Sequence, residues 1–415
     1  MSESSRNIMK NISTKVRLSD SLISMIGVVV GQLLFFISLW FIGRYLGADV
    51  LGELNYQLSL ATFLGTIFVF RYELACICNS SLESFKSLCN IYFLAIVVVS
   101  ILSAIALIFD NSIILIVLFA FSFIVIQGFI NYLNSLRKYV YIGFFRCIIN
   151  LFFTIAVVIL FLLDASSNLF LIYSILYSCV AIFLLILVFY EKYQEKTVLD
   201  FSFFLQENRR YPLFIFPSTC CSAIYLYALS IFIPVWYGLA DAGYFTVAYK
   251  MGFFPIALLS QSISGVFRRD MLSALDVSSS DIRDVYKTYM KYMLILAILY
   301  GIFSYLFSEW IIEFMFGQSW SLASTIYKYM IPLFFLQLLY SPASQLFLVF
   351  KKQKIDFLMN FLFGSALGIL FLINYIIHFS LINLIILFTA VSSIVLILNL
   401  CITYRMVFNY DRIYN

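Results

Sequence analysis

Long runs without charged residues dominate this sequence and decide what it can fold into. Eleven stretches of at least 17 residues contain no Asp, Glu, Lys or Arg. They cover residues 21–43, 54–70, 87–109, 111–136, 147–163, 165–190, 211–240, 251–267, 292–308, 329–350 and 357–404. A helix needs about 20 apolar residues to cross a bilayer, with a range of about 17–25. The pattern therefore predicts an all-α integral membrane protein.

The composition supports this prediction and excludes other classes of protein. Charged residues make up 11% of the chain, and its mean hydropathy is +1.01. Soluble chains carry roughly 25% charged residues, which they need to cover a surface that faces water. We therefore exclude a soluble enzyme, a secreted domain and a disordered chain.

The number of spans follows from the lengths of the runs. The run 251–267 extends back to residue 242 with a single interruption at Lys250. The last run, 357–404, is too long for one helix, and we expect it to divide between Asn374 and Asn383, where polar residues gather. The total is twelve transmembrane helices. Residues 1–20 are polar and basic with no signal-peptide cleavage pattern, so the first helix is expected to be retained.

The basic residues predict the orientation. If the N-terminus is cytoplasmic, 23 of the 26 Lys and Arg residues fall in cytoplasmic segments. The exceptions are Arg44, Lys328 and Lys250. Cytoplasmic loops of membrane proteins are enriched in Lys and Arg. Both termini are therefore predicted to be cytoplasmic.

The longest polar connection, residues 191–211, separates six predicted helices from six. Its phenylalanines among charged residues predict an amphipathic segment at the membrane surface. We expect an N-terminal lobe, 1–198, and a C-terminal lobe, 199–415, around a central cavity. Faint internal similarity relates Tyr45–Gly52 to Tyr237–Gly243 if one residue is skipped. Transporters built from repeats commonly bind substrate between the halves.

No catalytic or cofactor motif is present. The sequence contains no nucleotide-binding glycine loop, no zinc-binding HExxH and no nucleophile elbow. Its single histidine, His378, lies in a predicted outer turn, and its eight cysteines have no metal-site or disulfide spacing. We therefore expect no enzymatic activity, metal or cofactor, and no nucleic-acid partner. The short outer loops argue against a polysaccharide polymerase.

Lys250 is the first candidate for a substrate contact. It lies inside a span, where a lone cation costs about 2.5–3.5 kcal/mol and is a functional candidate by default. Its helical neighbours Gly243, Thr246 and Val247 are small or weakly polar, which favours a stripe that faces a cavity. The alternative is a lysine that extends to the outer interface.

Other candidates lie near the ends of predicted spans. Weaker cationic candidates for the same lining are Arg44, Arg71 and Arg146. Candidates for gating or helix bending are Glu53, Glu73, Pro217 and Pro255. We expect Glu53 to open the second span, where it complements the helix dipole. Arg71 and Glu73 are two residues apart, so we expect them to point to different helix faces and not to pair directly. Arg71 is then either an interfacial anchor or a gate or substrate contact.

The order of several short motifs resembles one family. The motifs are RYLGADVLG (44–52), FRYELA (70–75), IFPST (215–219), ADAGYFTVAYKMGFFP (240–255), FGQSW (316–320) and SPASQLFLVFKKQK (341–354). Together with the twelve-span layout they resemble Wzx-type O-antigen flippases, in the polysaccharide-transport branch of the MOP exporter superfamily. Related lipid II flippases carry a basic residue where Lys250 stands. Those relatives have two further C-terminal helices that are not predicted here, so we expect this chain to resemble that branch less.

The resemblance implies a function. It implies two six-helix lobes that move an undecaprenyl-diphosphate-linked oligosaccharide across the bacterial inner membrane by alternating access, for O-antigen or other surface polysaccharide. The partners would be the lipid-linked substrate, membrane lipids and the polymerase and chain-length machinery of that pathway. Two alternatives stay open: a drug/cation antiporter of the same fold, which would need carboxylates within its spans, and a polysaccharide polymerase.

Overall fold

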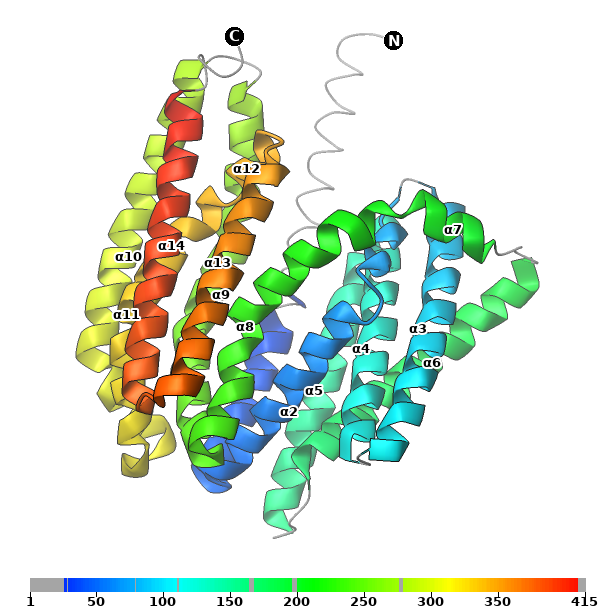
Figure 1. The fold of residues 1–415 in the computed structure, drawn as a ribbon, viewed down its shortest axis with the longest axis horizontal. Coiled ribbons are helices and arrows are strands. Elements are labelled where there is room, and N and C mark those ends of the chain that lie inside the picture. The colour runs from blue at the N-terminus through cyan, green and yellow to red at the C-terminus, as the bar shows by residue number, and fades with distance from the viewer. Residues whose placement is uncertain are drawn as a thin grey trace. The chain divides into compact units, whose positions relative to one another are not determined.

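The structure is a computed structural model, and it describes residues 26–27, 29–78, 80–109, 112–163, 168–195, 200–275 and 279–409. Every regular element in these residues is helical (Figure 1). The long helices are α2 (Ala48–Ile67), α3 (Ser81–Phe109), α4 (Ser112–Ser135), α5 (Tyr139–Leu162), α6 (Leu169–Glu195), α8 (Phe216–Tyr237), α9 (Leu239–Leu275), α10 (Ser279–Phe316), α11 (Ser321–Ala343), α13 (Gln353–Ile377) and α14 (Leu381–Phe408). The short elements are η1 (Tyr72–Cys76), α7 (Phe201–Glu207), η2 (Tyr211–Ile215), η3 (Gln318–Trp320) and α12 (Leu346–Val349).

The helices confirm an all-α protein that crosses the membrane many times. In the described residues, 10 helices are long and apolar enough to span a bilayer, and Val29–Tyr45 is a shorter apolar helix. The helix α2, which contains Asp49 and Glu53, is not among the 10. The count of twelve spans and the cytoplasmic position of both termini therefore stay predictions.

The long final run divides where the polar residues predicted a division. Helix α13 ends at Ile377, and His378 takes a left-handed conformation with φ 55°. The hydroxyl of Ser380 then accepts a hydrogen bond from the backbone N–H of Asn383 and caps α14. A serine cap satisfies one of the N–H groups that a helix start leaves without a partner, so a new helix begins here.

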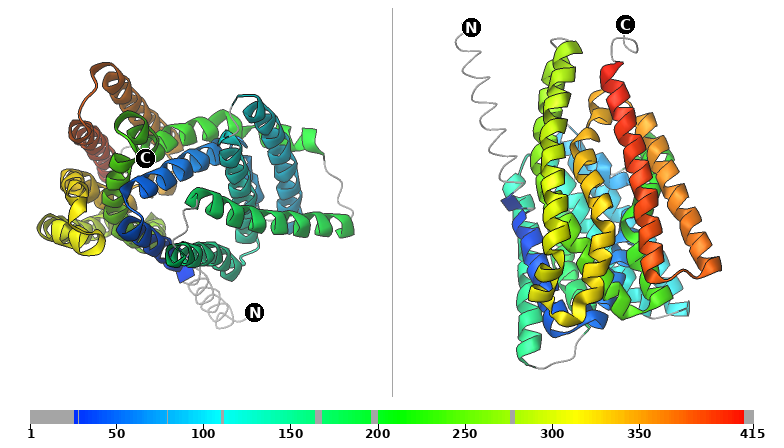
Figure 2. Two further views of the ribbon diagram at one scale, coloured as in Figure 1. Left: turned by 90° about the horizontal axis from the view of Figure 1, so that it is seen from below. Right: turned by 90° about the vertical axis from the view of Figure 1, so that its left-hand side faces the viewer.

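The chain forms two compact units. Unit 1 consists of the residues up to Tyr45 and of Tyr56–Cys220, whereas unit 2 consists of Leu46–Asn55 and Cys221–Asn415. In unit 1, α4 packs against α3, α6 and η1. In unit 2, α11 packs against α9, α10 and α14 (Figure 2). Many side chains of α11 are buried.

The predicted linker contains a short amphipathic helix in unit 1. The Asp200 carboxylate caps α7 by accepting from the N–H of Phe203. Phe204 is buried and its ring lies 5.5 Å from that of Tyr72 in η1, whereas Phe203 is exposed. One apolar side chain thus anchors α7 to its unit, and another remains available to lipid, as expected of a segment at a membrane surface.

The first turns of α2 and α9 cross closely within unit 2. Gly47 and Gly238 have positive φ values of 95° and 103°, and each immediately precedes one of these helices. Gly52 lies against the carbonyl of Leu239, and Gly243 lies against the carbonyl of Ala48. The contact is reciprocal. Gly52 of α2 meets Leu239, the first residue of α9, and Gly243 of α9 meets Ala48, the first residue of α2.

The crossing corrects the predicted repeat. In both segments the two glycines are five residues apart, so the repeat aligns without the one-residue gap that we assumed. Asp49 and Asp241 are therefore not equivalent positions. Helix axes can approach this closely only where the facing residues have no side chain.

Candidate functional site

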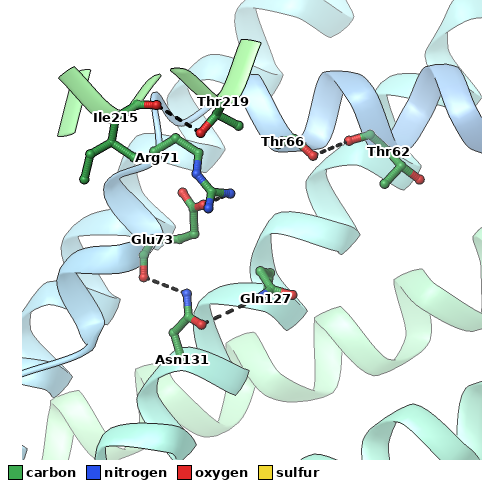
Figure 3. Close-up of polar contacts among 8 residues, drawn as sticks. All are labelled: Thr62, Thr66, Arg71, Glu73, Gln127, Asn131, Ile215 and Thr219. Carbon is green, nitrogen blue, oxygen red and sulfur yellow. Dashed lines mark hydrogen bonds and ion pairs between the residues drawn. The ribbon is translucent and has the colours of Figure 1, made fainter. Parts of the chain in front are cut away.

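A buried ion pair in unit 1 is the most unusual polar feature of the described residues. Nη1 of Arg71 lies 2.7 Å from Oε1 of Glu73 (Figure 3). Glu73 is 4% exposed and is the single buried charged residue in the part of the chain that the structure describes. Burying a carboxylate is costly unless a cation and hydrogen-bond donors compensate. Arg71 therefore has a direct role in holding Glu73 inside the unit.

The pair contradicts the prediction that these residues cannot meet. That prediction assumed a regular helix, but α2 ends at Ile67 and the chain turns. Phe70 and Arg71 take left-handed conformations with φ values of 48° and 64° before η1 begins. Non-glycine residues rarely adopt this region, and such strain clusters at functional sites. The turn brings the guanidinium back over the side chain of Glu73.

Side chains of α3 and α4 hold the backbone of η1. The amide of Asn131 donates to the carbonyl oxygen of Glu73 at 2.9 Å, and Gln127 contacts Asn131 at 3.5 Å (Figure 3). The hydroxyl of Ser84 donates to the carbonyl of Cys76. These bonds satisfy backbone groups that a short 3-10 helix leaves open, and they fix the position of Glu73.

The pair itself is incompletely satisfied. Oε2 of Glu73 and Nε of Arg71 are both buried and have no hydrogen-bond partner among the described residues. Arginine and carboxylate usually meet through two parallel hydrogen bonds, which this geometry does not form. Burial raises the pKa of Glu73 above its ordinary value of 4.5, although Arg71 and a backbone hydrogen bond act in the opposite direction.

Lys250 lies in unit 2, on α9, about 17 Å along the helix from Leu239 at 1.5 Å per residue. The lysine is half-buried. No carboxylate of the described residues forms an ion pair with it. A cation in this position can therefore attract an anionic ligand without first breaking an ion pair.

The expected cavity-facing stripe beside Lys250 is wrong. Thr246 and Val247 are 1% and 3% exposed, and Gly243 packs against Ala48. The hydroxyl of Thr246 donates to the carbonyl of Ala242 at 2.7 Å, within its own helix. Gly243 is small because it lies at the crossing with α2, a reason that sequence spacing does not reveal.

Pro255 lies inside α9 and is supported by two neighbouring helices. A proline removes one backbone donor from the helix ladder and commonly bends it. Near this point the hydroxyl of Tyr300 donates to the carbonyl of Gly252 at 2.8 Å. Tyr327 lies 3.1 Å from Tyr300 and 3.0 Å from Ser304, measured between hydroxyl oxygens. The network links α10 and α11 to the interrupted part of α9.

Pro217 follows a wide helical turn at the start of α8. The N–H of Phe216 bonds to the carbonyl of Tyr211, five residues earlier, in the π-helical η2. The hydroxyl of Thr219 bonds to the carbonyl of Ile215 at 3.0 Å (Figure 3). Such π-helical turns often mark functional positions in helices. The turn therefore supports Pro217 as a candidate for helix bending.

The remaining candidates are less informative. Arg44 is exposed at the end of the helix Val29–Tyr45. Arg146 lies on α5, and its side chain is outside the described part of the structure.

Glu53 is exposed on α2 but does not open that helix, because α2 begins at Ala48 and Asp49 is the acidic residue of its first turn. Of these candidates, the structure brings Arg71 and Glu73 together.

Sequence reasoning missed the side chains of these networks, among them Asn131, Gln127, Tyr300 and Tyr327. Asn131 and Gln127 are four residues apart in an otherwise apolar run, which places two amides on one helical face. This spacing of two amides is visible in the sequence and could have identified both residues. Nothing distinguished Tyr300 and Tyr327 among 29 tyrosines, because their role depends on the packing of three helices. Among the described residues no group of three or more His, Cys, Asp or Glu side chains could hold a metal.

Comparison with known proteins agrees with this architecture. A family described as "Polysaccharide biosynthesis protein" matches residues 84–325. A search of curated proteins finds no match. Among solved structures, the lipid II flippase MurJ in an inward closed conformation superposes with a TM-score of 0.70 at 16% identity, over 95% of this chain and 93% of that one.

Two further structures have the same fold. An inward-facing multidrug resistance MATE family transporter of the MOP superfamily gives a TM-score of 0.61 at 11% identity, over 95% of this chain and 99% of that one. A MOP superfamily transporter from Pyrococcus furiosus gives 0.60 at 13% identity, over 94% and 96%. At these identities the likeness establishes the fold.

Proposed function

Because the chain belongs to the polysaccharide biosynthesis protein family and has the fold of MOP transporters, we propose that it flips a lipid-linked oligosaccharide across a bacterial inner membrane. The substrate class is an undecaprenyl-diphosphate-linked repeat unit for O-antigen or another surface polysaccharide. Transport proceeds by alternating access of two six-helix lobes, 1–198 and 199–415, without chemical change of the substrate. Both chain termini lie in the cytoplasm.

The observation that carries this proposal is Lys250. A lipid-linked diphosphate has an anionic head and a polyprenyl tail that can remain in lipid. Its transporter needs cations at membrane depth, and Lys250 is half-buried in α9 without a carboxylate partner among the described residues. Charge-assisted contacts to phosphate are among the strongest hydrogen bonds in proteins. Arg44, Arg71 and Arg146 are further candidates for the same cationic lining.

The drug/cation antiporter remains the second candidate, supported by the likeness in fold to MATE transporters. It requires carboxylates in the membrane that bind the coupling or transported cation. The buried carboxylate of the described residues is that of Glu73, and it is already paired with Arg71. The observed charges therefore favour an anionic substrate.

The test begins with deletion of the gene. The strain should lose surface polysaccharide while the lipid-linked unit accumulates on the cytoplasmic side. Lys250→Arg should restore display in part. Lys250→Ala should restore little at equal protein level, because losing a contact of about 1.5–3 kcal/mol weakens binding about tenfold or more.

Lys328→Ala is the matched control, since Lys328 pairs with the exposed Glu309 on the same unit. Its display should be normal. Full display by Lys250→Ala would remove Lys250 from the site. Completed units that reach the outer face unpolymerised would indicate a polymerase, and a drug-efflux defect with normal polysaccharide would indicate an antiporter.

A further inference from the structure

We infer that the Glu73 carboxylate occupies the place on the Arg71 guanidinium at which a phosphate oxygen of the substrate binds, so that substrate binding displaces Glu73. The inference rests on the proposed function, because it names a contact for the diphosphate. It assigns Glu73 the role of an internal competitor that keeps Arg71 occupied until a lipid-linked diphosphate arrives.

The geometry of the pair carries this inference. Glu73 uses one oxygen and Arg71 uses one terminal nitrogen, at 2.7 Å. The second oxygen and Nε remain buried without partners among the described residues. Arginine–carboxylate pairs are frequently held by two parallel hydrogen bonds, whereas this pair has a single close contact. The carboxylate therefore holds the guanidinium less firmly than an anion that makes two contacts.

Access differs between the two side chains. The Arg71 side chain is 23% exposed, whereas that of Glu73 is 5% exposed. A ligand can approach the guanidinium from its open side while the carboxylate stays covered. A phosphate offers several oxygens and matches the planar donors of arginine. It can therefore replace the single bond from Glu73 with a two-bond contact.

The backbone around the pair holds the two side chains next to each other. Phe70 and Arg71 have φ values of 48° and 64°, in a region that non-glycine residues rarely adopt. The backbone that follows is fixed, because Asn131 holds the Glu73 carbonyl. The two side chains are thus held together by a strained turn and a firm support on α4.

The displaced carboxylate takes up a proton from water. Among the described residues, Arg71 acts electrostatically on Glu73, and Glu73 in turn acts on the thiol of Cys76 and the phenol of Tyr211. Burial raises the pKa of the Cys76 thiol and the Tyr211 phenol, so both stay neutral. Burial also raises the pKa of Glu73, so loss of Arg71 as its partner favours protonation.

The test measures binding of geranylgeranyl diphosphate to the full-length protein in nanodiscs by calorimetry. Glu73→Gln should bind about tenfold tighter than wild type, because the competing charge is removed. Arg71→Gln should bind weaker, and Arg71→Gln/Glu73→Gln should match Arg71→Gln, since no guanidinium remains to be freed. Glu309→Gln, which releases the exposed Lys328, should leave binding unchanged.

A second readout is proton uptake. In buffers of different ionisation enthalpy, wild type should take up a proton on binding and Glu73→Gln should not. If Glu73→Gln does not fold, Glu73→Asp replaces it, because the shorter carboxylate withdraws from Nη1 and should also tighten binding.

The outcomes separate this inference from the proposed function. Unchanged or weaker binding by Glu73→Gln overturns the inference. In that case the flippase proposal still stands if wild type binds the probe and Lys250→Ala weakens that binding. Absence of binding by wild type and every variant overturns both.

Discussion

At the scale of single residues, the burial of Arg71 and Glu73 predicts unequal effects of removing either one. Arg71→Gln leaves a nearly inaccessible carboxylate without its cation, and it should lose about 1–3 kcal/mol of stability. Glu73→Gln leaves a guanidinium that reaches solvent at its 23% exposed side chain, so the loss should be smaller. Thermal unfolding of the detergent-purified protein, followed by tryptophan fluorescence, measures both. Lys328→Gln is the control, and equal losses in the two variants would contradict the argument.

At the scale of elements, the crossing of α2 and α9 predicts that glycines differ in how well they tolerate substitution by alanine. A Cβ on Gly243 would overlap the carbonyl of Ala48, so Gly243→Ala should cost about 1–3 kcal/mol or prevent folding. Gly47 has φ 95° but open space around it, so Gly47→Ala should cost about 1 kcal/mol from backbone strain alone. Gly368 on α13 meets nothing within 4 Å, and Gly368→Ala should be neutral or slightly stabilising. Yield and melting temperature of the three variants provide the ranking, and a Gly243→Ala protein as stable as Gly368→Ala would exclude a tight crossing.

At the scale of the whole molecule, the predicted topology is testable by reporter fusions. Fusions after Lys138, Arg210 and Lys354 should read cytoplasmic, and fusions near Asp241 and His378 should read periplasmic. Contacts within unit 2 are consistent with this order. The hydroxyl of Tyr237 donates to the carbonyl of Phe379 at 2.7 Å, which joins two predicted outer turns. One inverted fusion would disprove the twelve-span order, because a missing or extra span reverses everything that follows it.

The ends predicted to be cytoplasmic also meet each other in unit 2. Phe267 and Met271 of α9, Ile282 of α10, Phe347 of α12 and Val407 of α14 form one buried cluster. A side-chain cluster of this kind at one end of a helical bundle requires those helix ends to share a face. The pattern of basic residues places these same helix ends in the cytoplasm, which stays a prediction.

The sequence alone determined the membrane class, the helical architecture and the division of the last run. These properties depend on hydropathy and local propensity, which follow directly from the order of residues in the sequence. It also singled out Lys250 as a cation inside an apolar run, and Arg71, Glu73 and Pro255 as candidates at the end of a span or at a helix bend. It could not show that Arg71 and Glu73 pair. Their contact depends on the left-handed conformations of Phe70 and Arg71, which no local sequence pattern predicts.

Tertiary structure alone decided what lies against each of these residues. The support of Glu73 by Asn131 joins residues 58 apart, and the bond from Tyr300 to Gly252 joins residues 48 apart. The reciprocal glycines of α2 and α9 meet only because both helices start after a glycine with positive φ and then cross. Contacts between distant segments result from packing geometry, which a single sequence does not encode in any local pattern.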